Sequence, residues 1–206
     1  MFNNTKYSDV SIYLGSAELL LPAHHAILGV RSPYFDDALE SGFKEGKERE
    51  FRFHDYSVHA LWRVFHFMYE GCYYDEPAES LSKEGKASVF GMLESTLMTL
   101  SGDDLELLKH PRVFALADMF RMDDLKALAV RNLEAQLQKH WISDTFPDCV
   151  REVYGNTAQD DAALRKIVVE VVKDHSGELC SRKVFLDVIR ESGDFAVDVV
   201  KKLARV

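Results

Sequence analysis

The sequence predicts an α+β domain followed by an all-helical C-terminal extension, and three observations carry this prediction. Apolar and polar residues alternate over residues 10–14, and a second apolar run follows the turn residues Gly15 and Ser16. This pattern is typical of a half-buried β-hairpin. Apolar residues then recur at helical spacing over residues 58–69. From residue 103 onward, helical patterns and short turn signals account for nearly all of the chain.

The first elements are a hairpin and a helix. The strands of the hairpin are expected at residues 10–14 and 17–21. The apolar residues of the next stretch, 23–30, change to helical spacing. This helix should end near Arg31, because Ser32 precedes a proline, and a residue in that position disfavours the helical conformation.

A second short helix is predicted to begin at once, so that two helices meet at a corner. Ser32 can cap it, and Pro33 suits its first turn, where a backbone N–H lacks a partner in any case. Gly42 is expected to mark its end.

The middle of the chain predicts further elements and one insertion. Residues 50–55 are predicted to form a short alternating strand with Phe51 and Phe53 inward. Residues 58–69 predict an amphipathic helix that ends at Gly71, and residues 72–74 suggest one more short strand. Residues 75–101 carry the weakest pattern and are interpreted as an insertion, with a helix at 89–100. The predicted domains are residues 1–137, including this insertion, and a helical extension at residues 138–206.

Composition and charge narrow the classes of partner. The chain has 34 acidic and 25 basic residues, a net charge of −9, and no basic cluster. Nucleic-acid binding normally needs basic residues to neutralise phosphates, so no nucleic-acid partner is predicted. No signal-peptide core and no apolar run of about 20 residues is present, so no membrane association is expected. Three dispersed cysteines fit a reducing compartment, and the predicted location is cytoplasmic, nuclear or both.

His24 and His25 are the most conspicuous candidates for chemistry, because they are adjacent in an apolar run. Neighbouring side chains on a helix point about 100° apart, whereas a helical metal pair needs a spacing of four. No phosphate loop, nucleophile elbow or dinucleotide fingerprint is present. The sequence therefore predicts no catalytic residue, no metal and no cofactor.

Three segments, in this order and spacing, resemble a BTB/POZ domain of the type abundant in fungi. They are residues 7–39, 51–74 and 110–133. The resemblance implies the fold shared with the Skp adaptors and elongin C, in which helices flank a small β-sheet. It also implies a protein–protein interaction module that dimerises in many members.

The resemblance implies a site for a cullin scaffold. Many family members are adaptors that dock a cullin and bring a substrate to a ubiquitin ligase, using a hydrophobic–x–acidic motif. Phe43, Lys44 and Glu45 stand in that place. An exposed aromatic ring can fill an apolar slot of a partner while the carboxylate accepts a hydrogen bond. The alternative is that Phe43 packs against its own domain and the charges are only solvated.

Structural roles are expected for Asp9, His24 and Ser32. By resemblance, His24 fastens the start of its helix to the preceding strands near Asp9, buried and hydrogen-bonded. His25 falls where relatives usually carry lysine or arginine, so a mostly neutral ring would face Asp9 here.

Dimerisation is expected to use a reduced surface. Classical homodimers of the family exchange an extra N-terminal strand and helix, but only about seven residues precede Ser8, where the residues Ser-Asp-Val lead into the first predicted strand. A homodimer stays among the expected partners. Two other interpretations stay open: a BTB scaffold in a transcriptional or chromatin assembly without a cullin, and an enzyme with dispersed catalytic residues.

Overall fold

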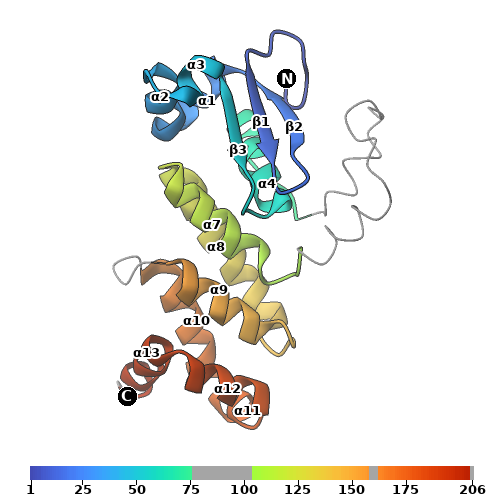
Figure 1. Cartoon of the computed structure of the whole chain (residues 1–206). Helices are drawn as coiled ribbons and strands as arrows, with labels where there is room; N and C mark the ends of the chain where they lie inside the picture. Colours follow the sequence, from blue (N-terminus) through green and yellow to red (C-terminus); the bar gives the residue numbers. More distant parts are fainter. Residues whose placement is uncertain (76–103, 158–161, 205–206) are drawn as a thin grey trace. The chain divides into compact units, whose positions relative to one another are not determined.

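The computed structural model describes residues 1–75, 104–157 and 162–204 (Figure 1). The chain divides into two compact units. Unit 1 comprises residues Met1–Leu105 and Leu116–Lys126, and unit 2 comprises Glu106–Ala115 and Ala127–Val206. The insertion predicted at 75–101, with its helix at 89–100, lies outside the described residues except for Asp75.

Unit 1 is built on a mixed three-stranded sheet. Strand β1 (Val10–Leu14) pairs antiparallel with β2 (Leu19–Ala23) and parallel with β3 (Glu50–Phe53), which gives the order β2-β1-β3. The predicted hairpin is confirmed, but β2 begins two residues later than expected. The reason is the turn, which the Glu18 N–H closes by donating to the Gly15 carbonyl at 3.1 Å.

The predicted corner of two helices is also confirmed. Helix α1 (His25–Arg31) ends before Ser32, whose extended backbone separates it from α2 (Pro33–Glu40). A short helix, α3 (Lys44–Glu48), then precedes β3. The sequence pattern of this charged stretch suggested only an exposed segment.

Helix α4 (Val58–Glu70) covers the sheet and ends where expected, at Gly71 in a left-handed conformation (Figure 1). The strand predicted at residues 72–74 is wrong. Side chains of α4 take up the carbonyl groups that strand pairing would need. His66 Nδ1 lies 2.9 Å from the Cys72 carbonyl oxygen, and Arg63 Nε donates to that of Tyr74 at 3.0 Å.

An aromatic cluster forms the core of unit 1. The rings come from α2, β3, α4 and the turn that follows helix α7 (Lys109–Met119), and neighbouring centroids lie 4.9 to 6.4 Å apart. Its members are Phe35, Phe51, Phe53, Phe65 and Phe120. Edge-to-face and tilted ring pairs of this kind are favourable beyond the area that they bury.

The rest of the described chain is helical. Helices α7 (Lys109–Met119) and α8 (Asp123–His140) are each divided between the two units. Unit 2 continues with α9 (Phe146–Asn156), α10 (Ala162–Asp174), α11 (Ser176–Cys180), α12 (Lys183–Glu191) and α13 (Gly193–Leu203). The predicted fold class, a small sheet with helices followed by an all-helical part, is confirmed. The domain boundary at residue 137 stays a prediction.

Unit 2 has its own apolar core, in which the rings of Phe146, Phe185 and Phe195 are fully buried. Their centroids lie 6.0 to 6.1 Å apart, so α9, α12 and α13 share one centre. Among the helices in the described ranges, none is both long and apolar enough to cross a membrane.

Candidate functional site

His24 sits in a closed hydrogen-bond network at the start of α1. Its side chain is 6% exposed. Nδ1 lies 2.8 Å from the hydroxyl oxygen of Tyr69, and Nε2 lies 2.9 Å from the backbone carbonyl oxygen of Lys6. The backbone N–H of His24 also donates to the Tyr69 hydroxyl, at 3.0 Å. Both ring nitrogens are therefore used inside the domain.

The hydrogen-bond partners determine the form of the ring. A carbonyl oxygen only accepts, so Nε2 must carry a proton and donate to Lys6. The Tyr69 hydroxyl accepts from the His24 backbone and can donate its own proton to Nδ1, which suits a neutral imidazole. Burial, with a smaller contribution from the negative charge of Asp9, raises the pKa of Tyr69 to about 12, so this proton stays in place at neutral pH.

Asp9 joins the start of α1 to the end of α3. Its Oδ1 accepts the backbone N–H of His25 at 2.8 Å, and its Oδ2 accepts from Arg49 Nη1 at 2.8 Å. The first contact occupies a helix N–H that has no partner within the helix. The cation beside Asp9 is therefore Arg49, which the sequence reasoning did not single out.

Ser32 links the corner of α1 and α2 to the turn that follows α7. The residue is fully buried. Its hydroxyl donates to the Phe120 carbonyl oxygen at 2.7 Å and accepts the Phe35 backbone N–H at 3.4 Å. The second contact caps α2, while the first joins residues that are 88 positions apart.

Neither histidine belongs to a metal site in the described part of the chain. Across residues 1–75, 104–157 and 162–204, no three His, Cys, Asp or Glu side chains form a group able to hold a metal ion. The contacts of His24 instead attach α1 to α4 and to the segment that precedes β1.

The start of α3 presents two side chains outward. Phe43 stands just before the helix with 76% of its surface exposed, and Glu45 in the first turn is exposed as well. Phe43 therefore does not pack into the core of its own domain. An aromatic ring this exposed gains free energy if a partner covers it.

Gly46 determines how α3 lies against the end of α2. A Cβ atom at this position would come within 2.4 Å of the Ser41 carbonyl oxygen and 2.8 Å of the Ala38 carbonyl oxygen. Only glycine permits this close approach of two backbones. The directions of Phe43 and Glu45 therefore depend on Gly46.

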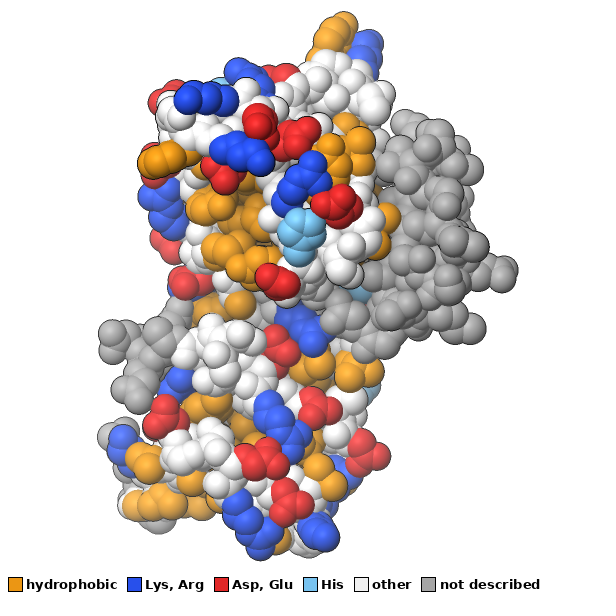
Figure 2. Space-filling model, viewed as in Figure 1, with side chains coloured by type: hydrophobic (Ala, Val, Ile, Leu, Met, Phe, Trp, Pro, Cys, Tyr) orange, Lys and Arg blue, Asp and Glu red, His pale blue; other side chains and the backbone are white. Residues whose placement is uncertain are grey.

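Tyr34 lies within electrostatic range of both Glu45 and Tyr56. Burial raises the pKa of Tyr34, and the nearby Glu45 and Tyr56 raise it further. Tyr56 also donates from its hydroxyl to the Met119 sulfur at 3.3 Å. We call Tyr34, Phe43, Glu45 and Tyr56 the α3 surface. In Figure 2, hydrophobic side chains gather below α2 and beside β3, next to charged side chains.

Arg63 of α4 donates hydrogen bonds to residues on either side of the range 76–103, which lies outside the described residues. It donates two hydrogen bonds to the Asp104 carboxylate, at 2.6 and 2.8 Å, and others to the carbonyl oxygens of Tyr74 and Asp75, at 3.0 and 3.2 Å. The side chains of Arg63 and Asp104 are each 4% exposed. Residues 75 and 104 are thereby joined to one guanidinium.

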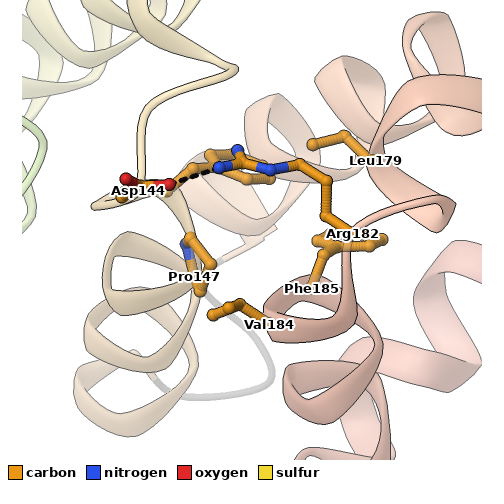
Figure 3. A pocket seen from close by; sticks show the side chains of 7 residues that line it. Asp144, Pro147, Leu179, Arg182, Val184 and Phe185 are labelled. Atoms are coloured by element: carbon orange, nitrogen blue, oxygen red, sulfur yellow. Dashed lines mark hydrogen bonds and ion pairs between the residues drawn. The ribbon is translucent and has the colours of Figure 1, made fainter.

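Unit 2 contains a small apolar cavity of about 70 Å³ (Figure 3). Its apolar walls are Phe146, Pro147, Leu179, Val184 and Phe185, and the ion pair of Arg182 and Asp144 also lines it. Most of the lining is apolar and its two charges pair with each other, which suits an apolar side chain rather than a charged substrate.

A folded domain that presents an exposed aromatic ring and, two positions further on, an exposed carboxylate is typical of proteins that bind other proteins. The family model described as BTB/POZ domain matches residues 1–84. The chain thus carries a BTB/POZ domain at residues 1–84, followed by a helical C-terminal region. BTB/POZ domains are protein–protein interaction modules.

Proposed function

We propose that this protein is an adaptor that docks a cullin-type scaffold of a ubiquitin ligase through the α3 surface and presents a substrate to it. The observation that carries the proposal is the 76% exposure of Phe43, two positions before an exposed glutamate. The ring offers an apolar anchor and Glu45 an acceptor, while Gly46 holds both in a defined direction.

The surroundings of Phe43 suit a docking site more than a purely structural loop. Exposed aromatic anchors, beside further aromatic residues that exclude water, contribute most of the binding energy in many protein interfaces. Tyr34, which is half-buried, supplies such a neighbour near Glu45. The polar residues Asp9, His24 and Ser32 are, in this proposal, structural, because their side chains form hydrogen bonds within unit 1.

Copurification from a cell extract tests the proposal. Immobilised wild-type protein should retain a cullin, identified by mass spectrometry, and the double variant Phe43→Ala/Glu45→Ala should not. The matched control is Tyr7→Ala/Glu48→Ala, because Tyr7 is 77% exposed, Glu48 is an exposed residue of the same short helix, and neither belongs to the α3 surface. This control should retain the cullin as the wild type does.

Each outcome decides a separate point. Equal retention by wild type and Phe43→Ala/Glu45→Ala would show that the docking motif is wrong. No retention by the wild type would reject the adaptor proposal and favour a BTB scaffold that works without a cullin. A further variant, Gly46→Ala, should also lose the cullin, because its Cβ would meet the Ser41 carbonyl oxygen and displace α3.

A further inference from the structure

Phe43 is held in place by its backbone rather than by its side chain. The ring is 76% exposed, so packing inside unit 1 contributes little to its direction. The backbone N–H of Phe43 donates to the Ser41 hydroxyl oxygen at 3.3 Å, and its carbonyl oxygen accepts from the Lys47 N–H at 3.2 Å. Both backbone groups of the residue therefore have a partner, one on each side in the sequence.

The Ser41 hydroxyl connects the end of α2 to the start of α3. Besides accepting the Phe43 N–H, it donates to the Ala38 carbonyl oxygen at 2.7 Å, in the last turn of α2. The last carbonyl groups of a helix have no partner within the helix, and this bond satisfies one of them. A single hydroxyl group thus uses its donor and one acceptor position to fix the Phe43 backbone to α2.

Gly42 links Ser41 to Phe43 and is surrounded by open space. It is exposed, and a Cβ atom added to it would meet no atom within 4 Å. A glycine backbone also has more conformational freedom than that of any other residue. Without the Ser41 hydroxyl, rotation at Gly42 would change the direction in which the Phe43 side chain leaves the domain.

We propose that Ser41 is a positioning residue of the α3 surface, and that its hydroxyl holds Phe43 in the direction in which a protein partner binds the ring. The inference rests on the proposed docking function and names the residue that prepares its anchor. A group held in its bound direction before association loses less conformational entropy on binding. Ser41 acts through Phe43 and not through a contact of its own with the partner.

Amide hydrogen exchange in the free protein, followed by NMR, tests the hydrogen bond without any partner. In Ser41→Ala, exchange at the Phe43 amide should be about fivefold faster than in the wild type, as the loss of one hydrogen bond predicts. Ser41→Thr keeps the hydroxyl and should exchange at the wild-type rate. The matched control is Ser181→Ala in unit 2, because the Ser181 hydroxyl also donates to the carbonyl oxygen three positions earlier, at 2.6 Å. This control should leave exchange at Phe43 unchanged.

Calorimetric titration of a purified cullin N-terminal domain into the same proteins tests the positioning role. Ser41→Ala should bind about fivefold more weakly than the wild type, whereas Ser41→Thr and Ser181→Ala should bind as the wild type does. In a Phe43→Ala background, Ser41→Ala should weaken binding no further, because the ring through which it acts has been removed.

The outcomes separate this inference from the proposed function. No binding by the wild type would reject the cullin proposal, and exchange at Phe43 would still decide whether Ser41 holds this residue. If the wild type binds, equal affinity of Ser41→Ala would overturn the positioning role, and so would a loss as large in the Phe43→Ala background as in the wild type. Unchanged exchange at the Phe43 amide in Ser41→Ala would overturn it in either case.

Discussion

The starts of helices α1 and α3 in unit 1 differ in where their side chains point, into the domain at α1 and into the solvent at α3. At the start of α1, His24 is 6% exposed and both of its ring nitrogens have partners within the domain. At the start of α3, Phe43 is 76% exposed and Glu45 is exposed beside it. Both ring nitrogens of His24 thus form hydrogen bonds within the domain, whereas Phe43 and Glu45 face the solvent, where we propose that a protein partner binds.

The largest decrease in the free energy of unfolding is expected where a buried charge loses its partner. Arg63→Met leaves the Asp104 carboxylate, 4% exposed, without its bidentate guanidinium. Removing one member of a buried ion pair costs about 3–5 kcal/mol, so the free energy of unfolding should fall by that amount in a urea titration. The double variant Arg63→Met/Asp104→Leu should recover part of the loss. A single variant as stable as the wild type would contradict the role assigned to Arg63.

The second-largest decrease in the free energy of unfolding is expected for His24→Ala. The substitution leaves the Lys6 carbonyl oxygen without its ring donor and removes the ring nitrogen that faces the Tyr69 hydroxyl, while the backbone N–H at position 24 remains. Buried groups without partners cost about 1–3 kcal/mol each, so we expect a loss of about 2 kcal/mol in urea unfolding. Adding Zn²⁺ to the wild type should not raise its thermal midpoint. A large rise that His24→Ala abolishes would show that the histidine binds metal after all.

Tyr69→Phe tests the hydrogen-bond network at His24 through the pH dependence of stability. The folded pKa of Tyr69 is about 12, above its ordinary value of 10.0, so the hydroxyl contributes stability that is fully present below pH 10 and is lost as pH rises towards 12. At pH 7 the variant should lose about 1–2 kcal/mol through its missing hydrogen bonds. Between pH 9 and pH 11 it should lose less stability than the wild type, measured by urea unfolding followed by circular dichroism. Parallel pH profiles would contradict this assignment.

The smallest effect on stability is expected at the α3 surface. Phe43→Ala removes a ring that has 76% of its surface in water, and substitutions of exposed residues usually change stability by no more than about 0.5 kcal/mol. Its thermal midpoint should match that of Tyr7→Ala, a ring of nearly equal exposure. A loss of stability several times larger would show that Phe43 supports the fold, and would weaken its role as a docking residue.

The sequence predicts correctly those elements that are determined by residues close to one another in the chain. The alternation at β1, the Ser-Pro corner and the glycine at the end of α4 each act within a few residues, and each appears where the pattern indicated. Ion pairs between residues that are far apart in the sequence leave no local pattern. Arg63 and Asp104 are 41 positions apart, and Arg49 and Asp9 are 40 apart, so neither contact could be found from spacing. The exposure of Phe43 likewise depends on the close approach of α2 and α3 at Gly46.

The central claim is that unit 1 binds a cullin scaffold through an exposed surface, at little cost to its own fold. The most direct test is calorimetric titration of a purified cullin N-terminal domain into wild type, Phe43→Ala and Tyr7→Ala, together with their thermal midpoints. We expect Phe43→Ala to bind at least about tenfold more weakly, as the loss of an anchor residue usually does, with an unchanged midpoint, and Tyr7→Ala to bind like the wild type. Equal affinities for all three proteins, or no binding by the wild type, would contradict the account.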